Sequence, residues 1–302
     1  MTAPLAAQNL KGAGLMTAAM AGFAVEDMLL KAAGQGLPVG LIMALFGVVG
    51  SLWFAGLALA MGERIWQPAM AGRAMRNRAL AEILGRIGYT LAIVFAPLST
   101  VSAILQATPL VVVAGAALLL GEQVGWRRWS AILVGLAGVL LILQPWQAEL
   151  EITVLFAIIG LLGFAGRDLA TRAAPRGLTN RQFGLSGFAV LIPTGIVLYL
   201  TGLGGDAAAI ADGAALWRAL GFVMLGGTVG VAAYASLTAA MRMGEVAVVT
   251  PFRYTRLLFG IGLGVLAFGE RPGALVLVGS AVVLSAGLYT LARQAGAGRK
   301  RA

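Results

Sequence analysis

Apolar runs long enough to cross a membrane follow one another along almost the whole chain, with only short polar breaks between them. A transmembrane helix needs about 20 predominantly apolar residues to span about 30 Å of hydrocarbon. The pattern therefore predicts an all-α, polytopic membrane protein with ten transmembrane helices and no loop long enough to hold a soluble domain. The ten segments are 12–31, 37–61, 79–96, 99–120, 126–145, 152–172, 181–202, 215–240, 246–268 and 273–292.

A stretch near the N-terminus returns in the second half of the chain. The sixteen residues from Gly22 to Leu37 match those from Gly163 to Leu178 at eight positions, 141 residues later. A second echo, LLLGEQ at Leu118–Gln123 and LAFGER at Leu266–Arg271, follows at a shift of 148 residues. Because the two echoes keep their order and nearly their spacing, they indicate one unit written twice.

The duplication predicts a first five-helix repeat over 12–146, a second over 152–292 and a basic tail over 293–302. Five is an odd number, so the sixth helix crosses in the opposite direction to the first, and the second repeat must be inverted. Inverted repeats are typical of alternating-access transporters, whose substrate site lies near the bilayer midplane between the halves. A structural alternative stays open here, since duplication is also a simple way to build a stable bundle.

Composition and charge agree with a membrane protein. Apolar residues make up 60% of the chain and charged residues 11%, with a mean hydropathy of +0.91, whereas soluble domains are about 45–50% apolar and about 25% charged. If the N-terminus is inside, sixteen Lys and Arg lie on the inner side and three, Lys31, Arg218 and Arg271, on the outer side. Both termini are therefore predicted to be cytoplasmic, and the net charge of +10 is assigned to this bias rather than to a nucleic-acid partner.

The chain contains no Cys and no His, which excludes disulfides, Cys or His metal sites, thiol nucleophiles and imidazole acid–base chemistry. We expect no metal, no cofactor and no enzymatic activity. No P-loop is present, so transport would be driven by gradients. Glu26 and Asp27 interrupt the first apolar segment, which is therefore predicted to be a retained helix rather than a cleaved signal peptide.

Ten helices in an inverted five-plus-five duplication, with the Gly-Glu turns LLLGEQ and LAFGER after helices four and nine, resemble the EamA family of the drug/metabolite transporter superfamily. Within that family the chain is most similar to bacterial YddG-type exporters of amino acids and metabolites. A Pro about a dozen residues before the Gly-Glu is also common in the family. Pro109 fits this pattern in the first half, but Leu257 stands at the matching position in the second half.

The resemblance implies a secondary transporter in the cell inner membrane that exports small metabolites, amino acids including aromatic ones foremost, from the cytoplasm by alternating access. The expected partners are a small-molecule substrate and the lipid bilayer. The oligomeric state stays open, and a monomer is compatible with the sequence. An exporter of drugs or organic cations is the alternative within the superfamily. A membrane-embedded enzyme and a non-transporting scaffold are the alternatives from other classes.

Two arginines lie within the ninth segment, where a charge costs about 2.5–3.5 kcal/mol or more at the helix centre. Arg253 and Arg256 are three residues apart and share a helix face. The guanidinium fork suits a carboxylate or phosphate, so both are candidate substrate-binding residues. An internal ion pair that fixes the helix to a neighbour is an equally open interpretation.

Carboxylates in the first helix are the second group of candidates. Glu26 is predicted to receive a substrate ammonium group or a coupling proton. For Asp27 the favoured interpretation is an i,i+4 pair with Lys31, repeated as Asp168 with Arg172. Glu26 has Arg167 as its repeat counterpart, so the site is expected to be asymmetric there.

Polar and aromatic residues near the middle of other helices complete the predicted site. Matching midplane positions are polar in both repeats, as a central cavity requires, while each aromatic alone is more often a packing residue. The pair Glu82 and Arg86 is interpreted as a surface pair, and Glu122 and Glu270 as turn and capping elements. The remaining predicted substrate-binding residues are Tyr89, Gln106, Thr108, Phe164, Tyr234 and Tyr254.

Overall fold

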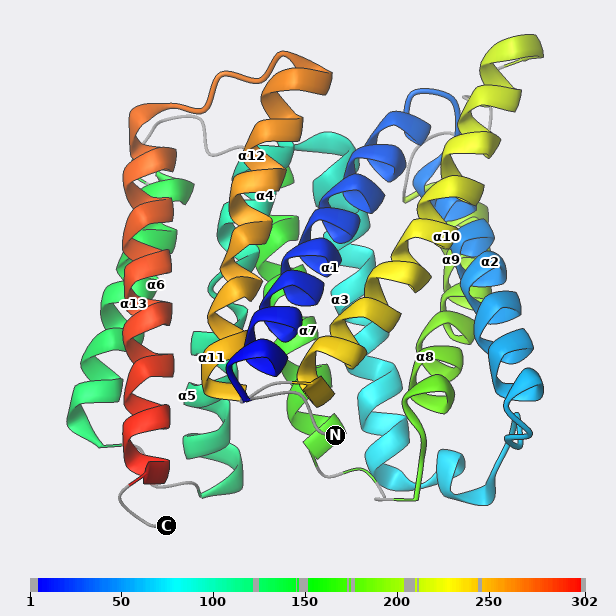
Figure 1. The fold of residues 1–302 in the computed structure, drawn as a ribbon. Helices are drawn as coiled ribbons and strands as arrows, with labels where there is room; N and C mark the ends of the chain where they lie inside the picture. The colour runs from blue at the N-terminus through cyan, green and yellow to red at the C-terminus, as the bar shows by residue number, and fades with distance from the viewer. Residues whose placement is uncertain are drawn as a thin grey trace. The chain divides into compact units, whose positions relative to one another are not determined.

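The computed structural model is helical, with no strand among the residues that it describes, namely 5–121, 125–144, 146, 152–172, 174, 177–203, 210, 212–243 and 246–299. The all-α prediction is therefore confirmed over this part of the chain. The helices are α1 (Leu5–Ala33), α2 (Val39–Ala60), η1 (Pro68–Ala71), α3 (Arg73–Phe95), α4 (Leu98–Leu105), α5 (Thr108–Leu120), α6 (Trp126–Leu143), α7 (Ile152–Arg172), α8 (Asn180–Ala189), α9 (Leu191–Leu200), α10 (Gly213–Met243), α11 (Val246–Val249), η3 (Thr250–Tyr254), α12 (Thr255–Phe268) and α13 (Ala274–Arg299) (Figure 1).

Six stretches of helix in the described residues are long and apolar enough to cross a membrane. Helix α3 is not among them because Arg and Glu side chains interrupt it, and the 14-residue α12 is short. The full set of ten spans therefore stays a prediction. The six are Ala7–Ala33, Val39–Ala60, Leu98–Leu119, Thr153–Thr171, Asn180–Leu200 and Gly213–Met241, and shorter apolar stretches cover Trp129–Leu143 and Ala274–Tyr289.

Two compact units divide the chain, and each draws on both halves of the sequence. The first unit comprises Met1–Ala24, Pro97–Val154 and Ala232–Ala302, and the second comprises Val25–Ala96 and Leu155–Val231. These two units show which helices lie in contact and not the direction in which each helix crosses the membrane. The repeats over 12–146 and 152–292 and the tail over 293–302 accordingly stay a prediction.

In the first unit, α6 lies along α13 and α4 lies along α12 (Figure 1). Glycines let the first pair approach closely. A Cβ added to Gly138 would lie 2.9 Å from the carbonyl oxygen of Gly279, and a Cβ added to Gly279 would lie 2.6 Å from that of Gly138. Leu110 of α5 and Ile132 of α6 are buried in one cluster with Ala286 of α13, which joins α5 to this pair.

The break between α4 and α5 occurs beside Pro109, as a residue without an amide hydrogen favours. The hydroxyl of Thr108 donates to the carbonyl oxygen of Leu105 at 2.6 Å and so satisfies a carbonyl freed by the break. Gly121 and Gly269 end α5 and α12 with φ of 68° and 64°, a left-handed conformation that favours glycine. The glycine of the Gly-Glu motif thus ends a helix at both places.

Glu270, just after the second of these turns, caps another helix. Its carboxylate accepts hydrogen bonds from the backbone amides of Leu98 at 2.6 Å and Ser99 at 2.9 Å, the first residues of α4. The amides at a helix start have no partner within the helix, so this carboxylate satisfies them and complements the helix dipole. Glu122, its predicted equivalent, lies outside the described residues.

In the second unit, α2 packs along α8 and α9, and α3 packs against α7. Gly40 of α2 faces Gly195 of α9 so closely that a Cβ on Gly195 would lie 2.6 Å from the carbonyl oxygen of Gly40. The backbones of Gly85 and Gly163 meet in the same way between α3 and α7. Small residues at these crossings let apolar helices pack without a hydrophobic driving force from water.

A polar cluster fixes the start of α8. Thr179 and Gln182 form a reciprocal capping box, and the hydroxyl of Thr179 donates to Glu63 Oε2 at 2.8 Å. Arg181 Nε donates to the same oxygen at 2.9 Å, and its Nη2 donates to Glu63 Oε1. The hydrogen bonds from Arg181, helped by the one from Thr179 and opposed by burial, hold the pKa of Glu63 below its ordinary value.

We predict that Gly195→Val destabilises the protein by about 1–3 kcal/mol or more, because the new side chain meets backbone atoms of α2 that cannot move aside. The measurement is the midpoint of thermal unfolding in detergent. Gly56→Ala is the matched control, since Gly56 lies on α2 with no atom within 4 Å of an added Cβ. Equal midpoints for the Gly195→Val variant and the parent chain would contradict the close packing of α2 and α9.

We also predict a pH-dependent contribution from Glu63. Because its folded-state pKa is lowered, the contact with Arg181 stabilises the fold at neutral pH and loses this effect as the pH falls through the lowered pKa. The unfolding midpoint of Glu63→Gln should lie below that of the parent at pH 7, by the equivalent of about 1 kcal/mol or less for a partly exposed pair. The difference should shrink as the pH falls below the ordinary glutamate pKa of about 4.3 and vanish below the lowered pKa. A difference that grew on acidification would refute this assignment.

Candidate functional site

The predicted site residues fall in both compact units. Glu26, Tyr89 and Phe164 lie in the second unit, on α1, α3 and α7. The other six, all in the first unit, are Gln106, Thr108, Tyr234, Arg253, Tyr254 and Arg256. The three residues of the second unit belong to a dense cluster of charged and aromatic side chains.

Helix α3 supplies the centre of this cluster. Arg78, Glu82 and Arg86 are spaced four residues apart, and Tyr89 follows three residues later, so all four share one helix face. Glu82 is buried, with a relative exposure of 4%, and so is Arg78 with 7%. The face therefore points into the unit rather than away from it.

Glu82 lies among three guanidinium groups. Its Oε1 is 3.6 Å from Nε of Arg86 and 3.5 Å from Nη1 of Arg167, which comes from α7. Its Oε2 is 3.8 Å from Nη2 of Arg78. Arg78 also donates to the hydroxyls of Thr171 and Ser186. One buried carboxylate is thus shared by arginines of two helices.

Helix α1 adds two further carboxylates. Oε1 of Glu26 lies 3.4 Å from Nη1 of Arg86, and the hydroxyl of Tyr89 donates to Oδ1 of Asp27 at 2.5 Å. Lys31 Nζ donates to the carbonyl oxygens of Ile93 and Ala96 at the end of α3, at 3.2 and 2.5 Å. These polar contacts tie the second half of α1 to α3.

Aromatic rings surround the guanidinium of Arg86. Its Cζ lies 5.0 Å from the ring centroid of Phe46, 5.7 Å from that of Phe164 and 5.9 Å from that of Phe188. The ring of Tyr89 meets Phe164 edge to face at 5.3 Å. Such rings stabilise a desolvated guanidinium by cation–π attraction.

The sequence interpretation of Glu82 and Arg86 as a surface pair is wrong, because Glu82 is buried and binds arginines of two helices. The i,i+4 spacing is the same on an exposed and on a buried face, so it does not decide the location. Asp27 contacts Tyr89, and Lys31 contacts the end of α3. The predicted i,i+4 pairing of Asp27 with Lys31 stays a prediction. In the second repeat, Asp168 pairs with Arg167 at 2.9 Å, and the side chain of Arg172 lies outside the described ones.

The predicted residues of the first unit form a smaller polar group. Gln106 Nε2 donates to the carbonyl oxygen of Tyr254 at 3.3 Å, which joins the break before α5 to the end of η3. The hydroxyl of Tyr254 is buried against Gly287 and has no hydrogen-bond partner in the described residues. The guanidinium of Arg256 lies 5.4 Å from the ring centroid of Phe23.

The other three predicted residues of the first unit are Thr108, Tyr234 and Arg253. The hydroxyl of Thr108 donates to the carbonyl oxygen of Leu105 within its own helix break. The backbone carbonyl of Tyr234 accepts the hydroxyl of Thr238 on α10. Arg253 lies in η3, three residues before Arg256 in α12, and is half-buried.

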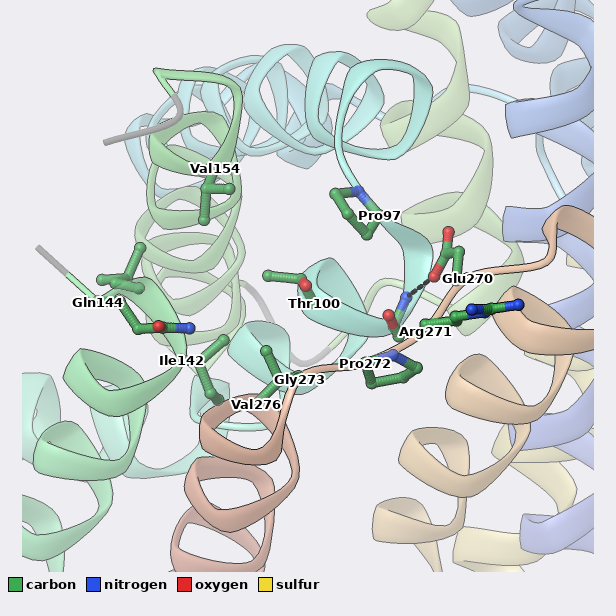
Figure 2. A pocket seen from close by; sticks show the side chains of 12 residues that line it. Pro97, Thr100, Ile142, Gln144, Val154, Glu270, Arg271, Pro272, Gly273 and Val276 are labelled. Atoms are coloured by element: carbon green, nitrogen blue, oxygen red, sulfur yellow. Dashed lines mark hydrogen bonds between the residues drawn. The ribbon is translucent and has the colours of Figure 1, made fainter. Parts of the chain in front are cut away.

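A cavity of about 310 Å³ lies in the first unit, beside the turn that carries Glu270 (Figure 2). Thr100, Ile142, Val154 and Val276 line it, and the carboxylate of Glu270 points to the start of α4. None of the predicted site residues lines it. No group of His, Cys, Asp and Glu in the described residues is arranged to hold a metal ion.

The sequence interpretation placed Glu82 and Arg86, with Arg78 one turn earlier, at the surface rather than in a buried cluster. The available signal was the i, i+4, i+8 spacing of these three charges, continued by Tyr89, within an otherwise apolar helix. The sequence relates Arg167 of α7 to this site only as the repeat counterpart of Glu26. Its contact with Glu82 depends on the packing of α3 against α7.

We predict that Glu82→Gln lowers the free energy of unfolding by about 3–5 kcal/mol, because it leaves three guanidinium groups without their shared carboxylate. The measurement is the thermal unfolding midpoint in detergent. Asp212→Asn, at an exposed carboxylate just before α10, is the control and should leave the midpoint unchanged. If both variants unfold at the parent midpoint, Glu82 does not stabilise the cluster.

Comparison with known proteins identifies several relatives, although no protein-family model matches the chain. The riboflavin transporter of Rhizobium johnstonii is 28% identical over 227 residues, which cover 75% of this chain and 72% of the relative. The S-adenosylmethionine uptake transporter of Rickettsia felis is 24% identical over 216 residues, covering 71% and 70%. The pseudopaline exporter CntI of Pseudomonas aeruginosa is 24% identical over 283 residues, covering 92% and 95%.

A solved crystal structure has a similar fold, with a TM-score of 0.59 over 93% of this chain and 98% of its own, at 20% identity. That likeness bears on the fold alone. The three relatives carry the names of transporters, and the chain has six helical stretches long and apolar enough to cross a membrane. The protein is therefore a multi-pass membrane protein, and its relatives support a membrane transporter.

Proposed function

We propose that this protein is a secondary transporter that moves a small organic metabolite across the membrane by alternating access. The observation that carries the proposal is the cluster around Glu82, in which buried charged side chains of α1 and α3 lie inside an apolar unit and contact an arginine of α7. Charges within membrane helices are costly and mark substrate or ion pathways. A protein that only needed a stable bundle would fill this space with apolar side chains.

Ten spans in two inverted five-helix repeats, with both termini cytoplasmic, are part of the proposal. Two contacts of the first unit support the duplication. Gly138 meets Gly279, 141 positions later, and Gln106 bonds to Tyr254, 148 positions later. These separations equal the shifts of the two sequence echoes. In a structure with a two-fold axis, residues near the axis contact their own counterparts.

The substrate class that we propose is the amino acid, including aromatic amino acids. Arginines, carboxylates and aromatic rings are all present among the candidate residues, which suits a molecule with a carboxylate, an ammonium group and a ring. The residues proposed to contact it are those predicted from the sequence. They are Glu26, Tyr89, Gln106, Thr108, Phe164, Tyr234, Arg253, Tyr254 and Arg256.

A flat heteroaromatic metabolite is the second candidate. The relative from Rhizobium johnstonii, and another from Brucella anthropi that is 24% identical over 286 residues, are named riboflavin transporters. The rings of Phe46, Phe164 and Phe188 offer apolar faces within one unit. Such faces would suit a fused ring system as well as an amino-acid side chain.

The proposal also names the protein family, the membrane in which the protein lies and the direction of transport. Membership of the EamA family of the drug/metabolite transporter superfamily, with YddG-type exporters as the nearest type, rests on the Gly-Glu turns and the duplication. That resemblance implies the inner membrane and export from the cytoplasm. The relatives include one named for uptake and one named as an exporter, so the experiment has to measure both directions.

We predict saturable flux of at least one aromatic amino acid in proteoliposomes that contain the purified protein. The assay measures uptake of radiolabelled phenylalanine, tryptophan, riboflavin and S-adenosylmethionine, with and without unlabelled solute inside. Unlabelled substrate inside should accelerate uptake, because alternating access exchanges solute across the membrane. Protein-free liposomes give the passive leak.

The outcome separates the candidates. Flux of riboflavin without flux of amino acids would favour the second candidate. Flux of organic cations alone, measured with a labelled cationic dye in the same liposomes, would favour the drug exporter considered from the sequence. Leak-level flux for the whole panel in both directions would defeat the proposed transport function.

A further inference from the structure

Arg86 has hydrogen-bonding capacity that its neighbours do not use. Its Nε is buried and has no hydrogen-bond acceptor in the described residues, and the nearby oxygen of Glu82 is 3.6 Å away. Its Nη1 reaches Glu26 at 3.4 Å, whereas charge-assisted hydrogen bonds are usually about 2.7–2.9 Å. A guanidinium carries five donors, and buried donors are almost always satisfied. The loose contacts of Arg86 therefore call for a further acceptor.

A second arginine stands beside it. Arg86 and Arg167 approach the same oxygen of Glu82, at 3.6 and 3.5 Å. They also face the same ring, that of Phe164, with Cζ to centroid distances of 5.7 and 4.8 Å. Arg167 also donates from Nε and Nη2 to Oδ1 of Asp168, at 3.0 and 2.9 Å, so of the two arginines it is Arg86 that has a buried donor without an acceptor in the described residues.

The cluster becomes more accessible along this line of residues. The exposed fraction of the side chain is 4% for Glu26, 15% for Arg86 and 26% for Arg167. An entering ligand would therefore meet the arginines before the carboxylate of Glu26. The carboxylate of Glu26 lies against Gly230 of α10, where an added Cβ would be 2.6 Å from Oε2. Glu26 therefore has no room to move further toward α10.

We propose that Arg86, with Arg167 beside it, binds a carboxylate group of the substrate, and that Glu26 is the resting counter-ion which this carboxylate displaces from Arg86. Phe164 supports the apolar part of the same molecule. The proposal rests on the transport function proposed above and names the group by which the substrate is held. It adds Arg86 and Arg167, on α3 and α7, to the contact residues predicted from the sequence and assigns the substrate carboxylate to them.

Binding is tested on the purified full chain in detergent, by the shift of its unfolding midpoint with three matched probes. Phenylacetate is an aromatic carboxylate, phenethylamine an aromatic cation and 2-phenylethanol a neutral analogue. Phenylacetate should raise the midpoint in a saturable manner, because only a bound ligand stabilises the folded state by mass action. The other two probes should give little or no shift.

Two variants give opposite results if the proposal holds. Arg86→Gln should weaken phenylacetate binding at least about tenfold, since it removes charged donors. Glu26→Gln should strengthen it by roughly threefold or more, because the competing counter-ion loses its charge. A purely structural role would weaken binding in both. Arg86→Lys, which keeps the charge without the fork, tests the site if the glutamine variant does not fold.

Arg218→Gln, at an exposed arginine on α10, is the control and should bind phenylacetate as the parent does. The proposal is overturned if phenylacetate gives no shift, if phenethylamine gives the larger one, or if Glu26→Gln weakens binding. It is also overturned if Arg256→Gln abolishes the shift while Arg86→Gln retains it. Flux that is normal in Arg86→Gln would defeat this site alone, whereas Arg86-dependent binding without any flux would defeat the transport function alone.

Discussion

The cost of placing charge among apolar helices governs the second unit. Glu82 is tolerable there only because guanidinium groups from α3 and α7 surround it, and those guanidinium groups are tolerable only because carboxylates from α1 and α3 offset them. The close crossing at Gly85 and Gly163 brings α3 and α7 near enough for these contacts. Packing by small residues and pairing of charges therefore depend on each other, and neither helix arrangement nor ion pairs can be explained alone.

Much of the fold follows from local features that a sequence displays directly. Apolar length predicts the helices, and the Gly-Glu motif predicts turns that end α5 and α12. The break between α4 and α5 divides the single segment predicted over 99–120, and Pro109 beside it is a local cause. Each of these features acts within a few residues. The left-handed conformation of Gly121 and Gly269, for example, needs no partner from elsewhere in the chain.

The candidate site was less accessible to sequence reasoning because its contacts join distant residues. The spacing of Glu82 and Arg86 shows that they can pair, but a buried and an exposed helix face carry the same spacing. Which face of α3 meets α7 depends on Gly85 and Gly163, one of many glycine pairs in a chain with 43 glycines. Glu26, Tyr89 and Phe164, which the sequence predicts to bind substrate, lie in this cluster, and their role in binding stays a prediction. Their partners could be assigned only with the fold.

The carboxylate of Glu270 has a consequence for movement within the first unit. It holds the first two amides of α4 from the loop that joins α12 to α13, across 172 residues of sequence. Sliding α4 along α12 would separate both amides from their acceptor. This end of α4 is therefore held in place relative to the loop after α12. Any bending of α4 relative to α5 is then concentrated at the break beside Pro109, which acts as a hinge.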